Sequence, residues 1–311
     1  MTYHLRNSVS IITRDDPRFS SKRCDQYSCA KGPIVAIYRS RWLPLLLLLL
    51  ACQAARAADE LTLAIEPFLS ARALVGAFQP FCNHLSNRTE TKVVPITAPN
   101  YDQYAQRLLN QEFDIAIIGP HTALLAAQRA NYLPLLKGEG FLKALLIVDK
   151  NSAYQKPADL KAQTIALPDH LTMTSMLGTE FFRPADAAPI DVHFRYNDFH
   201  NTAALMMLRG EAAAAVVADS ALLPMSMEIR ENIRIIAESK QVPQMVILIH
   251  SRIPVKLRSK LLDAMHDYIK ITAPQKNFLA RVGFSAAKPL TDQDNRQLAP
   301  YVEELKRRLG P

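Results

Sequence analysis

Hydroxyl side chains gather in one short stretch of the sequence, at residues 172–175. An apolar run with the composition of a buried strand precedes them at 164–167, and a helix is expected over 174–182. The free backbone N–H groups at a helix start, with Thr172, Thr174 and Ser175 beside them, favour an anion with several oxygen atoms. The alternative is that one hydroxyl only caps the helix, which is a common role for Ser and Thr.

A second segment places polar groups after an expected strand. Residues 113–120 form an apolar run that closes with Gly119 and Pro120, as a strand buried on both faces does. In open α/β sheets that end is where ligands bind. The backbone N–H groups there, the Thr122 hydroxyl and His121 are candidate anion donors. The alternative is that Thr122 is a plain helix cap and His121 a solvated turn residue.

A third segment follows the strand expected at 192–195. His200 could donate to an oxyanion, while Asn201 could cap the next helix. Asp219, at the end of the apolar run 212–218, could accept from a protonated ligand or from hydroxyl groups. A carboxylate that closes a strand is more often a local cap.

No metal or catalytic signature accompanies these segments. The sequence lacks His-x-x-x-His, Cys-x-x-Cys and an Asp-rich calcium loop, and it has neither Gly-x-Ser-x-Gly nor a phosphate loop. We therefore expect no metal, no cofactor and no enzymatic activity. A hydrolase that uses His200 with Ser175 or Asp219 is the alternative that the residue types leave open.

The formal charge of +8 suggests a nucleic-acid partner, but its distribution argues against one. The first 57 residues contain nine of the 37 Lys and Arg and three of the 29 Asp and Glu, so residues 58–311 carry a net charge near +2. A basic patch able to hold a phosphodiester backbone is not evident. We expect no nucleic-acid partner.

The N-terminal region has the parts of a secretory signal peptide at 35–57. Two arginines precede an apolar core at 43–51, and a small-x-small site ends at Ala57. The core has about nine residues, whereas a bilayer span needs roughly 20, so we do not expect the mature protein to span a membrane. The predicted location is the periplasm.

Two further interpretations concern the same region. Residues 49–52 also resemble a lipobox, which makes a lipid anchor at Cys52 the less favoured alternative to a soluble periplasmic protein. Residues 1–34 are polar, mixed in charge and aperiodic, and we expect them to be disordered or to precede the true start of the protein.

From residue 58 onward strands and helices alternate. Strands are expected at 61–65, 91–96, 144–148, 164–167, 192–195, 212–218 and 245–249, and the later helices at 255–271 and from 291. This rhythm favours mostly parallel sheets flanked by helices. If the strands near Leu146 and Leu248 connect two lobes, lobe one comprises 58–146 plus 252–311 and lobe two 147–251. Two connecting strands form a hinge that lets lobes close on a ligand.

Several of these features together resemble the periplasmic phosphate/phosphite/phosphonate-binding proteins of ABC importers. The resemblance covers nearly all of residues 61–290 and depends on the order and spacing of Gln79-Pro80-Phe81 with Leu85, Tyr101, 113–120, 157–161, the hydroxyl stretch after Asp169, 199–201 and 210–216. It implies an α/β, two-lobed type II periplasmic-binding-protein fold with the ligand cleft between the lobes. The ligand-binding residues we expect are Thr172, Thr174, Ser175, His200, Gly119, His121, Thr122, Asp219 and Tyr101.

The hydroxyl stretch departs from the family pattern. That family loop typically reads Ser-Thr-Ser-Gly, and here the matching residues are Thr172, Met173, Thr174 and Ser175. Losing a hydroxyl that meets a buried anion costs roughly 1–3 kcal/mol when its partner goes unpaired. The departure from the family loop affects the expected identity of the ligand more than the expected fold.

The resemblance implies a function outside the cytoplasm. We expect a solute-binding protein that captures a small phosphorus oxyanion, whether phosphonate, phosphite or phosphate, for an ABC permease in the inner membrane. The alternative is a sensory binding protein that presents its ligand to a membrane receptor kinase, and the sequence does not separate the two.

Overall fold

The computed structural model describes residues 60–222, 224–271, 278–284 and 286–310. All of them belong to one unit, Ala57–Pro311. The predicted extension at 1–34, the signal peptide at 35–57 and the lipid-anchor alternative at Cys52 lie outside the described residues. Within the described residues, no helix combines the length and the apolar character that crossing a bilayer requires.

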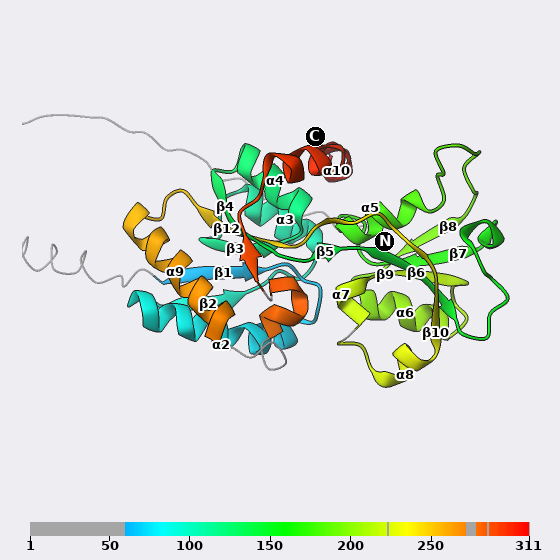
Figure 1. Cartoon of the computed structure of the whole chain (residues 1–311), viewed down its shortest axis with the longest axis horizontal. Helices are drawn as coiled ribbons and strands as arrows, with labels where there is room; N and C mark the ends of the chain where they lie inside the picture. The colour runs from blue at the N-terminus through cyan, green and yellow to red at the C-terminus, as the bar shows by residue number, and fades with distance from the viewer. Residues whose placement is uncertain (1–59, 223, 272–277, 285, 311) are drawn as a thin grey trace, which may run out of the picture. The chain divides into compact units, whose positions relative to one another are not determined.

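The first lobe is built on a six-stranded sheet with strand order β13-β4-β12-β3-β1-β2 (Figure 1). Its central strands are apolar on both faces, because helices cover both. The strands are β1 Leu61–Ile65, β2 Val93–Ile96, β3 Ile115–Ile118, β4 Tyr132–Gly138, β12 Val246–His250 and β13 Ala287–Lys288.

Alternate residues of these strands supply two separate cores. Leu63 and Ile117 pack in the core formed with α2 (Ala71–Thr89) and α9 (Val255–Ile271). Their neighbours Ala64 and Ala116 pack on the opposite face, in the core formed with α3 (Tyr101–Leu109) and α4 (Pro120–Arg129). The period of two that defines a strand therefore fixes the layer to which each side chain belongs.

The second lobe repeats this plan on a five-stranded sheet with order β10-β6-β9-β7-β8. One face packs against α5 (Met173–Glu180), and the other against α6 (His200–Leu208) and α8 (Met227–Glu231). The strands are β6 Ala144–Asp149, β7 Thr164–Leu167, β8 His193–Tyr196, β9 Ala214–Ala218 and β10 Ile233–Glu238; the short helices η1 Pro157–Leu160 and α7 Asp219–Leu222 complete the lobe.

Both sheets are mixed, which corrects the expectation of mostly parallel sheets. Strands β2, β1 and β3 are parallel, but β12 is antiparallel to β3 and β4. In the second lobe β8, β7 and β9 are parallel, and β6 is antiparallel to β9 and β10. The chain enters β6 and β12 from the other lobe and not through a covering helix, and it is parallel strands that require a crossover connection, usually a helix.

The chain passes between the sheets at a short antiparallel pair of strands. β5 (Phe141–Leu142) pairs with β11 (Val242–Pro243), whereas Leu146 and Leu248 lie inside the two large sheets. Strand β12 belongs to the first sheet, although the expected boundaries put residues 147–251 in lobe two. The sequence misplaced the crossovers because β5 and β11 are two residues long, too short to give a periodic signal.

The C-terminal helix contacts both lobes. Thr291 caps α10 (Asp292–Leu309), with its hydroxyl accepting from the Asp294 N–H at 3.2 Å. The helix packs against α4 of the first lobe. Its Tyr301 hydroxyl donates to Glu180 Oε1 at 2.7 Å, at the end of α5 in the second lobe. Pro300 lies inside α10 without dividing it.

Candidate functional site

A cavity of about 440 Å³ lies between the two lobes. Each lobe contributes polar groups to its wall, and apolar side chains such as Leu142, Leu205 and Met225 cover much of the rest. A concave, largely apolar site with a few polar groups is typical of small-molecule binding. Among the residues expected at the site, five line the cavity: Tyr101, Gly119, Thr172, Thr174 and His200.

The hydroxyl stretch forms the start of α5, and its three hydroxyls have different partners. The Thr172 hydroxyl accepts from the Ser175 N–H at 3.1 Å and donates to the Asp169 carbonyl at 2.8 Å, and Thr172 also lines the cavity. The capping and ligand-site interpretations therefore both apply to this residue. Thr174 lines the cavity and makes no side-chain hydrogen bond to another described residue.

Ser175 lies behind this surface. It is fully buried, its hydroxyl donates to the Pro168 carbonyl at 2.8 Å, and it is absent from the described cavity wall. The hydroxyl thus fixes the loop that precedes α5. Asp219, the first residue of α7, is likewise not part of the described wall, although its neighbours Ala218 and Ser220 are. Its Oδ1 accepts from the backbone N–H groups of Lys143 and Ser220. This is the local-cap role that the sequence left as the alternative.

His200 opens α6 and lines the cavity. Its Nδ1 accepts from the Ala218 N–H at 3.2 Å, which leaves the ring proton on Nε2. Burial lowers the pKa of His200 to about 4, so the ring is neutral at pH 7 and acts as a donor without charge. Asn201 also lines the cavity, and the N-cap of α6 is Phe199 and not Asn201.

The start of α4 is organised differently from the expectation. Gly119 is the N-cap and lines the cavity, but its N–H donates to Glu66 Oε2 at 2.9 Å. A Cβ at Gly119 would lie 3.2 Å from His121 Cε1, a tight contact, and 3.6 Å from Glu66 Oε2, an ordinary one. Thr122 is buried and is not part of the described wall.

His121 is a buried contact between the lobes, not a solvated turn residue. It is 1% exposed, and its Nε2 donates to the Leu171 carbonyl of the second lobe at 2.8 Å. Burial lowers its pKa to about 4, which keeps the ring neutral. Its Nδ1 has no hydrogen-bond partner among the described residues.

Tyr101 begins α3 and lines the cavity from the first lobe. Burial and the nearby carboxyls of Glu66 and Asp169 raise its pKa well above the ordinary value, so the phenol keeps its proton. Tyr101 therefore offers a neutral hydroxyl donor from the lobe opposite Thr172.

Glu66 is the functional candidate that the sequence analysis missed. It follows β1, lines the cavity, and has a pKa raised by burial to about 7. Its position directly after a buried strand, beside Pro67, is the same signal that singled out Gly119. In the sequence, Glu66 and Pro67 indicate only the end of a strand.

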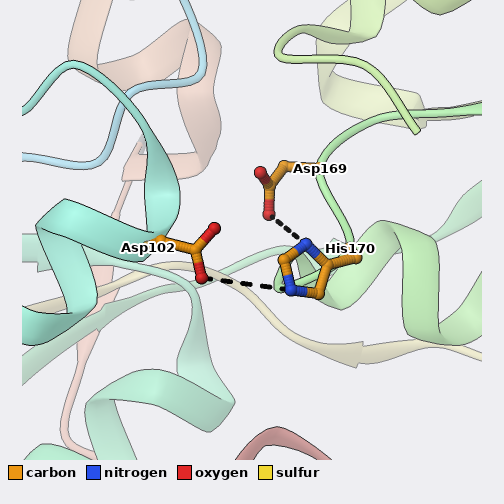
Figure 2. Close-up of side chains that lie close together, drawn as sticks. All are labelled: Asp102, Asp169 and His170. Carbon is orange, nitrogen blue, oxygen red and sulfur yellow. Dashed lines mark ion pairs between the residues drawn. The ribbon is translucent and has the colours of Figure 1, made fainter. Parts of the chain in front are cut away.

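A second polar cluster joins the lobes outside the described cavity wall (Figure 2). His170 Nδ1 lies 3.5 Å from Asp169 Oδ1, and its Nε2 lies 4.0 Å from Asp102 Oδ1 of the first lobe. These are the described side chains that could hold a metal ion, with ligand atoms within 4.8 Å of one another. However, Asp169 Oδ1 already accepts from the Leu171 N–H, and the two carboxylates approach different ring nitrogens, which is the arrangement of an ion-pair network.

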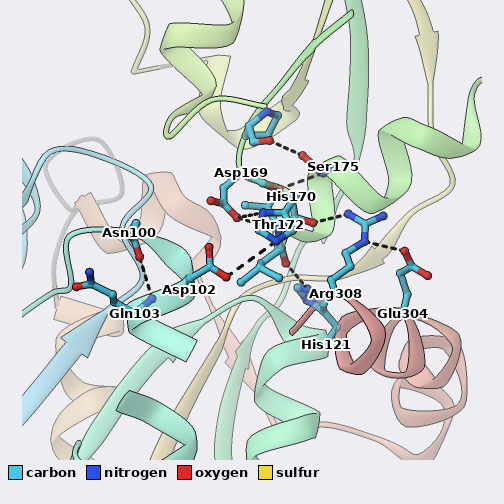
Figure 3. Close-up of polar contacts among 12 residues, drawn as sticks. Asn100, Asp102, Gln103, His121, Asp169, His170, Thr172, Ser175, Glu304 and Arg308 are labelled. Atoms are coloured by element: carbon cyan, nitrogen blue, oxygen red, sulfur yellow. Dashed lines mark hydrogen bonds and ion pairs between the residues drawn. The ribbon is translucent and has the colours of Figure 1, made fainter. Parts of the chain in front are cut away.

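Figure 3 shows how this network continues into the C-terminal helix. Arg308 donates to the His170 carbonyl and, at 2.7 Å, to Glu304 Oε1. The loop 168–172, which ends at the N-cap of α5, is therefore held from the first lobe by His121 and from α10 by Arg308.

Comparison with known proteins accounts for this architecture. Residues 63–295 match the family model of periplasmic phosphonate substrate-binding proteins of ABC transporters. The protein belongs to this family of ABC-transporter substrate-binding proteins. No curated protein matches its sequence.

Solved structures share the two-lobed type II fold of the family. The phosphonate-transporter binding protein of Pseudomonas aeruginosa is 20% identical with a TM-score of 0.67, over 81% of this chain and 89% of that one. PhnD1 from Prochlorococcus marinus, solved with methylphosphonate, is 14% identical with a TM-score of 0.70, over 81% and 98%. A Xanthomonas citri protein bound to ATP is 15% identical with a TM-score of 0.64, over 80% and 98%. At these identities the similarity establishes the fold alone.

Proposed function

We propose that the protein captures a phosphorus oxyanion, with phosphonates as the principal class, in the cavity between its lobes and presents it to an ABC permease. The observation that carries the proposal is the start of α5. Thr172 and Thr174 line the cavity there, and the Thr174 hydroxyl has no partner among the described residues. The N–H groups of Met173 and Thr174 at this helix start likewise have no acceptor among the described residues. His200 and Tyr101 add neutral donors from both lobes. Family membership supports the transport role.

We also propose that the protein is not an enzyme. The hydrolase alternative needs His200 with a nucleophile from Ser175 or a base from Asp219. The hydroxyl of Ser175 and the carboxylate of Asp219 both bond to backbone groups, and neither residue belongs to the described cavity wall. A nucleophile and its base must lie within hydrogen-bond reach of each other and of the substrate. We further propose that the protein works in the periplasm, as its family does.

Calorimetric and thermal-unfolding titrations test the ligand class. The purified protein is titrated with methylphosphonate, phosphite, phosphate, sulfate and nitrate. A ligand at 100 times its dissociation constant stabilises the native state by about 2.7 kcal/mol, which raises Tm by several degrees. We expect a phosphorus oxyanion, and not sulfate or nitrate, to produce this shift. Equal binding of sulfate, or no binding of any phosphorus oxyanion, contradicts the proposal.

A further inference from the structure

Glu66 places a carboxyl group where the first lobe would otherwise offer a donor to an anion. The N–H of Gly119, at the start of α4, points at Glu66 Oε2 and is therefore not available to a ligand. The side chain lines the cavity from the first lobe, while Thr172 and Thr174 line it from the second. An oxyanion held at the start of α5 shares the cavity with this carboxyl.

The surroundings of Glu66 do not neutralise a negative charge. The described cavity wall contains a second carboxyl, Glu228, and neither lysine nor arginine. The titratable groups that face Glu66 are Tyr101 and Tyr104 of α3 and His121 of α4, with His200 and Glu228 across the cavity. The two phenols keep their protons because burial raises their pKa values well above the ordinary range.

The two histidines add no positive charge at neutral pH, since burial lowers each pKa to about 4. Glu66 itself has a pKa raised to about 7 by burial, even though the Gly119 N–H lowers it. An anion that enters the cavity repels the ionised form of Glu66 and raises this pKa further. The carboxylic acid form is the one compatible with a bound oxyanion.

We propose, resting on the function proposed above, that Glu66 binds the oxyanion as a carboxylic acid. One carboxyl oxygen accepts from the Gly119 N–H, and the other carries the proton and donates it in a hydrogen bond to a ligand oxygen. No covalent bond changes; capture of the ligand takes up one proton from solvent whenever free Glu66 is ionised. Glu66 is thus a specificity residue that couples capture of the anion to pH.

The linkage has a definite sign. Because the pKa of Glu66 rises on binding, affinity is complete well below pH 7 and falls by up to tenfold per pH unit above it. Between pH 6 and pH 8.5 the affinity for methylphosphonate falls by about 30-fold from this group alone. A cationic ligand group facing Glu66 requires the ionised carboxylate and gives the opposite slope.

The experiment measures methylphosphonate affinity from pH 6 to 8.5 for the wild-type protein, Glu66→Gln and Glu228→Gln. The amide introduced by Glu66→Gln keeps both roles, an oxygen for the Gly119 N–H and an N–H for the ligand, but does not titrate. We expect Glu66→Gln to retain the wild-type affinity of pH 6 within about threefold and to lose the 30-fold decrease. Glu228→Gln tests the second carboxyl of the cavity wall; because Glu228 is exposed, we expect the 30-fold decrease to persist in this variant, whatever its affinity at pH 6.

The ionisation of methylphosphonate is common to all three proteins, so the difference in slope isolates Glu66. Calorimetry of the wild type at pH 8 in buffers of different ionisation enthalpy provides an independent readout, with uptake of nearly one proton more than in Glu66→Gln. The inference is overturned if affinity depends on pH equally in the wild type and Glu66→Gln. It is also overturned if wild-type affinity rises with pH and Glu66→Gln removes that rise. Either result leaves phosphonate capture intact. Failure of every phosphorus oxyanion to bind at any pH overturns both.

Discussion

Two neighbouring hydroxyls at the start of α5 have different partners, and so different roles. Thr174 presents its side chain to the cavity, while the Ser175 hydroxyl is committed to the Pro168 carbonyl. A helix turns by about 100° per residue, so adjacent positions face different directions. Ligand affinity and stability should therefore respond to different members of this pair.

Replacement of Thr174 by Val should weaken phosphonate binding by roughly 10- to 150-fold, because loss of one hydrogen bond to a charged group costs about 1.5–3 kcal/mol. Stability should change little, since Thr174 has no intramolecular side-chain bond to lose among the described residues. Ser175→Ala should instead lower the free energy of unfolding by about 1 kcal/mol and leave affinity nearly unchanged. Calorimetry and urea unfolding of both variants check the assignment; the reverse pattern would place Ser175 at the ligand.

Among the helices and strands, α5 approaches the second sheet closely. A Cβ on Gly178 would lie 2.6 Å from Val216 Cγ1 of β9, so the glycine permits the contact between helix and strand. Gly76 in α2 has no such neighbour, since nothing described lies within 4 Å of the position of its Cβ. Replacement of glycine by alanine should therefore change the free energy of unfolding in opposite directions in α5 and α2.

We expect Gly178→Ala to destabilise the protein by about 1–3 kcal/mol through overpacking. Gly76→Ala, its control, should stabilise by about 0.5–1 kcal/mol, because alanine has less backbone freedom to lose in a helix. Denaturant unfolding of both variants measures the difference. Equal effects would mean that propensity and not packing sets the cost at position 178.

Across the molecule as a whole, titratable groups with shifted pKa values change the pH dependence of the free energy of unfolding in opposite directions. The folded pKa of His121 lies near 4, below the usual value of 6.5, so the unfolded chain binds more protons between these values. Acidification through this window therefore destabilises the protein, by up to about 3 kcal/mol for a fully buried ring. Glu66 acts in the other direction, because its folded pKa near 7 exceeds 4.5 and stability rises as pH falls through that interval.

The contributions of His121 and Glu66 can be separated by measuring the free energy of unfolding of single variants from pH 7 to 4. His121→Gln should make the loss of stability on acidification shallower, and Glu66→Gln should make it steeper. The glutamine side chain in both variants can still donate and accept hydrogen bonds, so the main change is the loss of a titratable group. Identical pH dependence in the two variants would show that other carboxyl groups dominate acid unfolding.

The alternation of strands and helices, the two-lobed α/β class and the hydroxyl-bearing helix start could all be predicted from the sequence. They depend on local signals: apolar runs of strand length, period-two burial, and capping residues such as Thr291. The family resemblance drawn from the order of those signals is confirmed by the match over residues 63–295. The ligand-site residues as a set stay a prediction.

Tertiary packing, and not the local pattern, selected which strands run antiparallel and where the chain crosses between the lobes. It also selected which polar side chains reach the cavity. Ser175 and Asp219 bond to nearby backbone, His121 bridges to Leu171, and Glu66 takes the N–H of Gly119. Each of these outcomes depends on a partner distant in sequence or on the rotation of a helix against its sheet. The local sequence pattern predicts which residue types follow a strand, whereas packing between helices and sheets determines which of their side chains face the ligand.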